Sequence, residues 1–298
     1  MAGYGPYSED ELNLQYSLRN VRPGYEKTMI PAWQERSHNY REKAAGNYDI
    51  RYGAGERDFA DYFPTPNPNG GLIVYIHGGY WQRGDKSIYS FIAEPYNKAG
   101  FSVIAINYML CPKVKIAAIP PQCRRAVVWA WENAETFRAN RDKFFVMGHS
   151  AGAHLTAWMM STDWSQYETG YPTNLIKACA PISGLYDFEP IRHTSENRGV
   201  GTNEGFGLNI ESAEEAQSVS LNAFPPKTKA PHLLGWGSKE SAEFVRQNKE
   251  HYERLVAANI PVKRIEVPGQ DHFDLCDVMG NGESELVTEI ISLFKKYC

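Results

Sequence analysis

Short apolar runs rich in β-branched and aromatic residues alternate with longer amphipathic stretches over most of this chain. Six such runs are strand candidates, at 72–77, 101–108, 143–148, 176–183, 231–236 and 261–267. Between them, segment 87–99 stops at Gly100 as a glycine-capped helix does, and segment 122–139 has apolar residues at helical spacing. Strands separated by helices form a parallel sheet that is covered on both faces. The pattern predicts an α/β fold.

Three stretches fall outside this rhythm: residues 1–68, 184–229 and 268–282. With 298 residues, 42% of them hydrophobic, the chain is long enough to bury a large core, so we expect one domain over 1–298. We interpret 1–68 as an N-terminal extension of helices and a hairpin. The segment 184–229 is rich in Gly, Asn, Ser and Glu, and long loops of this kind carry or cover function. It is the candidate lid.

Charge and cysteine content narrow the possible partners. The net charge of -4 gives no general attraction for nucleic acid or an anionic membrane, so we expect a small-molecule ligand. The polar N-terminus does not resemble a secretory leader, and no run of 18 apolar residues is present, which predicts no membrane partner. The five cysteines include no CxxC pair, and this pattern predicts reduced thiols. Reduced thiols in turn predict a cytoplasmic location.

Gly148-His149-Ser150-Ala151-Gly152 matches the pattern GxSxG, and it lies between the strand candidate 143–148 and a helical run, AHLTAWMM. A strand, this turn and a helix in sequence form the nucleophile elbow of α/β-hydrolases. There the glycines permit a sharp turn and the serine hydroxyl projects above the sheet. We therefore predict that Ser150 is the nucleophile.

A serine nucleophile needs a base and a carboxylate, which follow it along the chain in the order acid, then histidine. His272 stands in the loop after the last strand candidate and is the predicted base. The other candidates are better explained as packed or solvated histidines: His149, His154, His193, His232 and His251. The loop after 231–236 offers Glu240 as the acid, and Asp187, after the preceding strand, is the alternative.

His77-Gly78-Gly79-Tyr80-Trp81 ends the strand candidate 72–77, where lipases and esterases carry an HGGG-type motif. The backbone N–H groups of such a loop stabilise the oxyanion of acyl transfer. We predict an oxyanion hole formed by Gly79, Tyr80 and Ala151. Two aromatic residues replace the later glycines, and we expect Tyr80 and Trp81 to wall the substrate pocket.

The combination of HGGYW at 77–81 and GHSAG at 148–152 resembles the kynurenine formamidases (arylformamidases), a family of α/β-hydrolase fold with the signature HGGxW followed by GHSAG. The likeness continues in LNLQYS, DYFP, ISGLYDFEP, ESAEFVRQ and DHF, and so covers nearly the whole chain. The resemblance implies that Ser150 is the nucleophile, His272 the base and Glu240 the acid. Many members have Asp at the acid position, so this chain departs from the family there.

The activity implied by the resemblance is hydrolysis of N-formyl-L-kynurenine to L-kynurenine and formate, a step of tryptophan degradation, through a formyl-enzyme and without an organic cofactor. The resemblance also implies a homodimer. No HExxH motif or Cys/His cluster indicates a metal site. Two alternatives remain open: a carboxylesterase that acts on small acyl esters, and a catalytically silent binding protein of the same fold.

Overall fold

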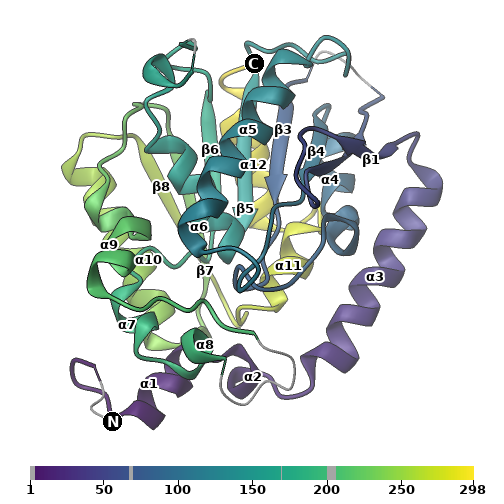
Figure 1. The fold of residues 1–298 in the computed structure, drawn as a ribbon. Helices are drawn as coiled ribbons and strands as arrows, with labels where there is room; N and C mark the ends of the chain where they lie inside the picture. Colours follow the sequence, from purple (N-terminus) through teal and green to yellow (C-terminus); the bar gives the residue numbers. More distant parts are fainter. Residues whose placement is uncertain (1–3, 67–69, 169, 200–205) are drawn as a thin grey trace.

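The computed structural model describes residues 4–66, 70–168, 170–199 and 206–298. At its centre is one eight-stranded sheet in the order β1-β2-β4-β3-β5-β6-β7-β8 (Figure 1). The strands are β1 (Asn47–Arg51), β2 (Phe59–Phe63), β3 (Leu72–Ile76), β4 (Ser102–Ile106), β5 (Phe144–His149), β6 (Ala178–Ile182), β7 (His232–Gly237) and β8 (Val262–Val267). The six strands predicted after residue 72 are confirmed as β3 to β8, and neighbours among them pair in parallel. The α/β fold is confirmed.

The two strands before residue 72 extend this sheet beyond β4 through antiparallel pairing. β1 pairs antiparallel with β2, and β2 pairs antiparallel with β4. Four of the five residues of β2 are buried, whereas β1 alternates between exposed and half-buried positions. β1 is therefore the solvent-facing edge of the sheet, and the hairpin expected within 1–68 adds two strands to it.

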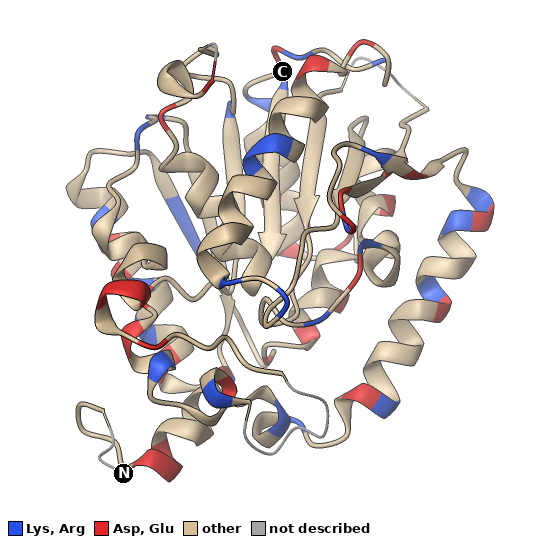
Figure 2. Cartoon of the chain, in the orientation of Figure 1, with Lys and Arg blue, Asp and Glu red and all other residues tan. Residues whose placement is uncertain are grey.

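Each central strand is buried on both faces, because alternate side chains of a strand point in opposite directions. In β3, one hydrophobic core receives Leu72, Val74 and Ile76, and another receives Ile73 and Tyr75. The first core is covered by α5 (Ile119–Glu132) and α6 (Ala151–Met160), and the second by α12 (Glu285–Lys295) on the opposite face (Figure 1). Figure 2 shows that the strands between these helices are almost free of charged residues.

Two predicted helices are present with different bounds. The segment 87–99 begins as a 3-10 helix, η1 (Lys86–Ile92), and continues as α4 (Ala93–Lys98). The helix predicted over 122–139 is α5, which starts earlier and ends at Glu132. Two prolines in its first turn explain the early start, because proline suits positions where the backbone N–H has no partner within the helix.

The N-terminal extension contributes three helices: α1 (Glu9–Tyr16), α2 (Leu18–Val21) and α3 (Tyr25–Lys43). α1 begins with a capping box, in which the Ser8 and Glu11 side chains each bond to the backbone of the other. α3 packs along η1. In Figure 1, α1 and α2 lie beneath the carboxyl ends of the strands, the edge at which α/β enzymes bind ligands.

The candidate lid, 184–229, folds against the same end of the sheet (Figure 1). It contains α7 (Glu189–Arg192), α8 (Ser195–Arg198), α9 (Ala213–Val219) and the 3-10 turn η4 (Leu221–Ala223), while its residues 200–205 lie outside the described structure. The remaining elements are η2 (Ile116–Ala118), η3 (Trp164–Gln166), α10 (Ala242–Ala257) and α11 (Asp274–Met279). Within the described ranges, every helix is too short or too polar to cross a membrane.

Candidate active site

Ser150 occupies a sharp turn between β5 and α6. Its φ of 57° and ψ of -121° form a backbone conformation that a non-glycine residue rarely adopts. The turn requires the glycines on either side of it. A Cβ on Gly152 would lie 1.9 Å from the carbonyl oxygen of Ile76, and one on Gly148 would lie 2.4 Å from the carbonyl oxygen of Gly152. The local structure is thus the nucleophile elbow expected from the motif.

Two loops at the same end of the sheet bring His272 and Glu240 to this serine. His272 follows β8, and its Nε2 lies 2.9 Å from the Ser150 Oγ. Its Nδ1 lies 2.8 Å from Oε1 of Glu240, which follows β7. The three side chains form a continuous chain of hydrogen bonds in the order that acyl transfer requires.

The other candidate acid and the other histidines are placed elsewhere. Asp187 accepts a hydrogen bond from the backbone of Glu189, whereas Glu240 is the carboxylate that pairs with His272. Of the remaining histidines, His149 alone lines the pocket at Ser150, and its Nδ1 lies 3.3 Å from the Cys276 thiol. Between the two carboxylates considered, the geometry favours Glu240.

Ser183 joins this chain of contacts, and sequence reasoning missed it. It follows β6, its φ is 54°, and its hydroxyl donates to Oε1 of Glu240. The same hydroxyl lies 2.9 Å from Nδ1 of His272. The available signal was its position in ISGLYDFEP at the carboxyl end of a strand candidate, because the ends of neighbouring parallel strands meet at one edge of the sheet.

Burial controls the charges of the pair formed by His272 and Glu240. It lowers the pKa of His272 to about 3 and raises the pKa of Glu240 to about 8, because a charged side chain loses its hydration there. Hydrogen bonds from Ser183 and from the backbone at Gly237 oppose the rise at Glu240. At neutral pH His272 is therefore uncharged, which is the state in which a histidine can accept a serine proton.

The HGGYW loop lies against the nucleophile. A Cβ on Gly78 would be 3.1 Å from the Cβ of Ser150, so the loop approaches the nucleophile closely at a position with little space for a side chain. Gly79, Tyr80 and Trp81 all have positive φ, which turns the loop back on itself after β3. Gly79 and Tyr80 line the pocket beside Ser150, and Ala151 begins α6 directly after it. It stays a prediction that the backbone N–H groups of Gly79, Tyr80 and Ala151 bind the same oxyanion.

The expectation that Trp81 walls the substrate pocket is wrong. Its side chain is completely buried and does not line the pocket that contains Ser150. The indole N–H donates to Nδ1 of His154 at 3.2 Å, and the ring packs against Phe188 at 4.8 Å between centroids. Trp81 turns away from the pocket into a core between the loop, α6 and the start of α7. Tyr80 is the one aromatic residue of the motif that faces the site.

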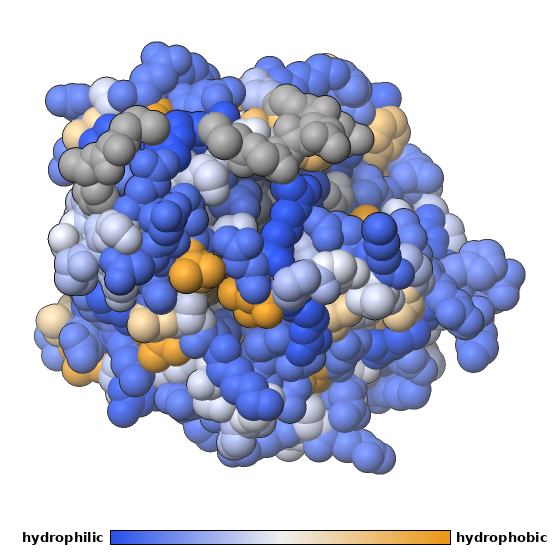
Figure 3. Space-filling view, turned by 90° about the horizontal axis from the view of Figure 1, so that it is seen from below, coloured by the Kyte–Doolittle hydropathy of each residue, from blue (hydrophilic) through white to orange (hydrophobic). Residues whose placement is uncertain are grey.

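The cavity above Ser150 has a volume of about 270 Å³. In Figure 3, which views the end of the molecule where α1 and α2 lie, hydrophobic residues are visible near the middle of a largely hydrophilic face. The cavity is walled mainly by aromatic and aliphatic side chains: Leu18, Tyr25, Ile30, Trp33, Tyr80, Ile88, Tyr89 and Phe273. Half of these come from the N-terminal helices, which the sequence identified only as an extension. The described part of the candidate lid adds Glu196.

An arginine at the end of α2 connects the N-terminal helices to the histidine loop. The Arg22 guanidinium forms ion pairs with Asp271 at 2.6 Å and with Asp274 at 2.8 Å. Asp271 in turn accepts hydrogen bonds from the backbone N–H groups of Phe273 and Asp274. These contacts fix the segment that carries His272. Within the described ranges, acidic, histidine and cysteine side chains form no group of three that could hold a metal ion.

The sheet topology and the contacts among Ser150, His272 and Glu240 define an enzyme of the α/β-hydrolase fold. The BD-FAE family model matches residues 62–255, and the chain belongs to this family. It is similar to the kynurenine formamidase of Danio rerio, with 29% identity over 98% of each chain. It is equally similar to that of Salmo salar, with 29% identity over 99% of this chain and 100% of the relative.

Among solved structures, the chain is similar to a putative thioesterase from Silicibacter sp. tm1040. The TM-score is 0.79 with 26% sequence identity, and the alignment covers 93% of this chain and 98% of that one. The similarity thus extends over most of the length of both chains.

Proposed function

We propose that this protein is a kynurenine formamidase, which hydrolyses N-formyl-L-kynurenine to L-kynurenine and formate. The observation that carries the proposal is that Ser150 and His272, hydrogen-bonded to each other, open into a small cavity walled by aromatic side chains. A cavity of about 270 Å³ suits a ligand with one aromatic ring. The full-length similarity to two kynurenine formamidases supports the same activity.

In the first step, the Ser150 Oγ attacks the formyl carbon while Nε2 of His272 accepts the hydroxyl proton. The carbonyl oxygen becomes an oxyanion, which is proposed to bind the backbone N–H groups of Gly79, Tyr80 and Ala151. Glu240 and Ser183 hold Nδ1 of His272, so that the second nitrogen faces the serine. The imidazolium that forms is stabilised by Glu240, because the neighbouring positive charge favours the ionised carboxylate over the neutral form that burial alone favours.

In the second step, His272 returns this proton to the aniline nitrogen, the C–N bond breaks, and L-kynurenine leaves. The formyl group stays on Ser150 as an ester. A water molecule then attacks the ester carbon, with His272 again accepting a proton, and formate is released as the serine recovers its hydrogen.

The shape of the site favours a one-carbon acyl group. Tyr80 and Gly78 lie beside Ser150, and the Tyr80 ring is buried at the position where an HGGG enzyme has a glycine. A longer acyl chain has less space there than a formyl group. Aromatic leaving groups gain from Tyr25 and Phe273, because stacked aromatic pairs add about 0.5–1.5 kcal/mol beyond burial. An anilide nitrogen also donates weakly to its carbonyl, which makes the carbon easier to attack.

Ester hydrolysis is the second candidate, because the similar solved structure is described as a putative thioesterase. The same serine, histidine and glutamate perform both reactions, so the fold does not distinguish them. Substrate preference does, because an esterase needs space for the acyl chain.

The test compares kcat/KM for N-formylkynurenine, an N-formyl aliphatic amine, and acetyl and butyryl aryl esters. We expect the aryl formamide to be the best substrate and the butyryl ester the worst. A clear preference for butyryl esters contradicts the formamidase proposal and supports the esterase. Failure of the protein to react with a fluorophosphonate probe supports a silent binding protein instead.

The proposed setting is a cytoplasmic one, because all five cysteines are free thiols and four of them are buried. We also propose that residues 1–298 act as one catalytic domain, with 184–229 as its lid. The proposed assembly is the homodimer that the family resemblance implies. Light scattering coupled to size-exclusion chromatography measures that mass directly.

A further inference from the structure

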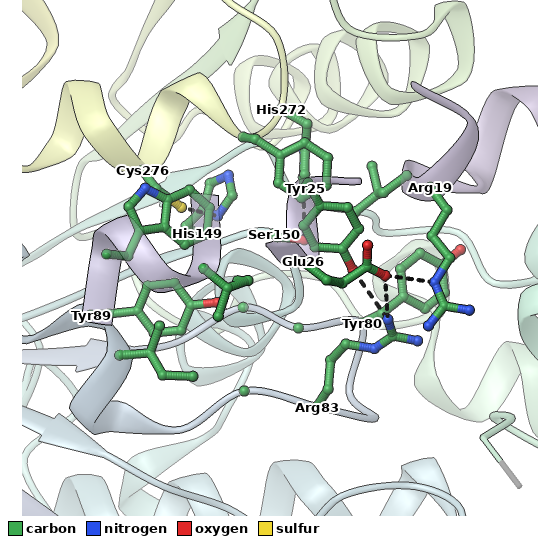
Figure 4. A pocket seen from close by; sticks show the side chains of 18 of the residues that line it. Arg19, Tyr25, Glu26, Tyr80, Arg83, Tyr89, His149, Ser150, His272 and Cys276 are labelled. Atoms are coloured by element: carbon green, nitrogen blue, oxygen red, sulfur yellow. Dashed lines mark hydrogen bonds and ion pairs between the residues drawn. The ribbon is translucent and has the colours of Figure 1, made fainter. Parts of the chain in front are cut away.

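One end of the otherwise apolar pocket is charged. Arg19, Glu26, Arg83 and Glu196 all line the cavity that contains Ser150. Figure 4 shows Arg19, Glu26 and Arg83 grouped beyond the rings of Tyr25 and Tyr80, whereas Tyr89, His149 and Cys276 lie on the other side of the serine. Two guanidinium groups and two carboxylates thus stand together at a pocket whose remaining walls are mostly aromatic and aliphatic.

Neighbouring side chains hold part of the Arg83 guanidinium, and another part faces the cavity. Its Nη1 donates to the Tyr25 hydroxyl at 3.1 Å and lies 3.8 Å from Oε1 of Glu26. Its Nε is buried and has no hydrogen-bond partner among the described residues. The side chain is 23% exposed, so its position is fixed while part of it faces the cavity. The part of the guanidinium that faces the cavity can donate a charge-assisted hydrogen bond to a carboxylate.

The carboxylates of Glu26 and Glu196 differ in whether they already have a bonding partner. Oε1 of Glu26 accepts a hydrogen bond from Nε of Arg19 at 2.8 Å, so this carboxylate is already paired. The Glu196 carboxylate has neither a hydrogen bond nor an ion pair within the described part of the chain. The α8 turn that carries it is nevertheless fixed, because the Gln82 side chain donates to the Glu196 carbonyl at 3.1 Å. Gln82 and Arg83 are neighbours in the loop that follows the HGGYW motif.

We propose that Arg83 and Glu196 are the specificity-determining residues for a zwitterionic amino-acid group on the substrate. The part of the Arg83 guanidinium that faces the cavity binds the α-carboxylate, and the Glu196 carboxylate binds the α-ammonium group. Glu26 and Tyr25 position Arg83 for this contact. The inference rests on the proposed function, in which the formyl end of the same substrate is at Ser150 and its ring packs against Tyr25 and Phe273.

Three aryl formamides test the assignment. N-formyl-L-kynurenine has both charges, N-formylkynuramine has the ammonium group alone, and ortho-formamidoacetophenone has neither. We expect Arg83→Met to lower kcat/KM for the first substrate by about 10- to 100-fold relative to the other two. We expect Glu196→Gln to lower kcat/KM for both ammonium-bearing substrates by about 10-fold relative to ortho-formamidoacetophenone. Each comparison is a ratio within one variant, so partial misfolding cancels.

The control is Arg264→Met, which removes an exposed arginine on β8 that does not line the pocket and should change none of the ratios. If Arg83→Met lowers all three rates equally, Arg83 only supports the pocket and the inference is overturned. A wild-type enzyme that hydrolyses all three formamides equally well also overturns it, while the proposed function stands. Absence of hydrolysis of every formamide refutes the proposed function and this inference with it.

Discussion

Ser150 was predictable because its requirements are local. The sharp turn, the two glycines and the flanking strand and helix are all encoded within a few residues, and the structure has Ser150 at a φ of 57°. Ser183 and Arg83 were not predictable in the same way. Ser183 contacts Glu240 and His272 because β6 lies beside β7 and because the loops after β7 and β8 meet at this serine. Arg83 matters because α2 and α3 return to the site, which no pattern within the sequence reveals.

Replacing Ser150 or His272 by alanine tests the nucleophile and the base. We expect Ser150→Ala and His272→Ala each to lower kcat by roughly 10⁴-fold or more, because members of such a unit act together. Circular dichroism should show that both variants remain folded. Ser150→Ala should also fail to react with a fluorophosphonate. Substantial turnover by either variant contradicts its assigned role.

The acid is tested by a pair of isosteric changes. We expect Glu240→Gln to lower kcat by roughly 10³- to 10⁴-fold, because an amide can hold the imidazole in the wrong tautomer. Asp187→Asn is the matched control and should keep nearly full activity, because its side chain bonds to the backbone of Glu189 and Glu240 is the partner of His272. Steady-state kinetics of both variants decide the point. The reverse result would transfer the role to Asp187.

At the scale of elements, the strands were easier to predict than the N-terminal helices. β3 to β8 are short, apolar and bounded by turn residues. A sequence of this kind is typical of a parallel strand that is buried on both faces. α3 gives a much weaker signal, because a long mostly polar surface helix shows no strong apolar stripe. Only the packed structure reveals that its first turns, with Tyr25, Ile30 and Trp33, form a wall of the pocket.

This arrangement makes Arg22 a positioning residue for the histidine loop. We expect Arg22→Met to lower kcat by about 10-fold, because the ion pairs with Asp271 and Asp274 hold the segment that carries His272, and small displacements of a catalytic group are costly. The effect on the free energy of unfolding should be small, since the arginine is 34% exposed.

Arg36→Met is the control for this experiment. Arg36 pairs with Asp277 on α11, farther along the chain from His272. Its loss should leave kcat unchanged, and Arg22→Lys should restore part of the activity of Arg22→Met. Equal losses of kcat in Arg22→Met and Arg36→Met, measured on folded protein, would show that Arg22 has no specific effect on the histidine.

At the scale of the whole molecule, six of the eight histidines are buried in the uncharged state. Burial lowers the pKa values of all six: His77, His149, His154, His232, His251 and His272. Below their ordinary pKa of 6.5, the unfolded chain binds protons that the folded chain does not. The stability that these groups provide is therefore complete above pH 6.5 and is lost as the pH falls toward about 4.

Denaturant unfolding at about pH 7, 6 and 5 measures this dependence. We expect the free energy of unfolding to fall below pH 6.5 by more than about 1.4 kcal/mol per pH unit, the value for one proton. Glu240 acts in the opposite direction, because a pKa raised to about 8 gives stability at low pH that is lost as the pH rises through that value. A flat profile between pH 6.5 and 5 contradicts the prediction.

The ion pairs of Arg22 also determine when the active site can form during synthesis. Arg22 and Asp274 are 252 residues apart in the sequence, yet their side chains are in contact. A nascent chain exposes the pocket-lining helices α2 and α3 long before the ribosome has made the histidine loop that they hold. Until then the apolar side chains of Tyr25 and Trp33 have no Phe273 to pack against. Contacts of such long range slow folding, so the catalytic end of this enzyme is expected to be completed last and to depend most on protection by chaperones.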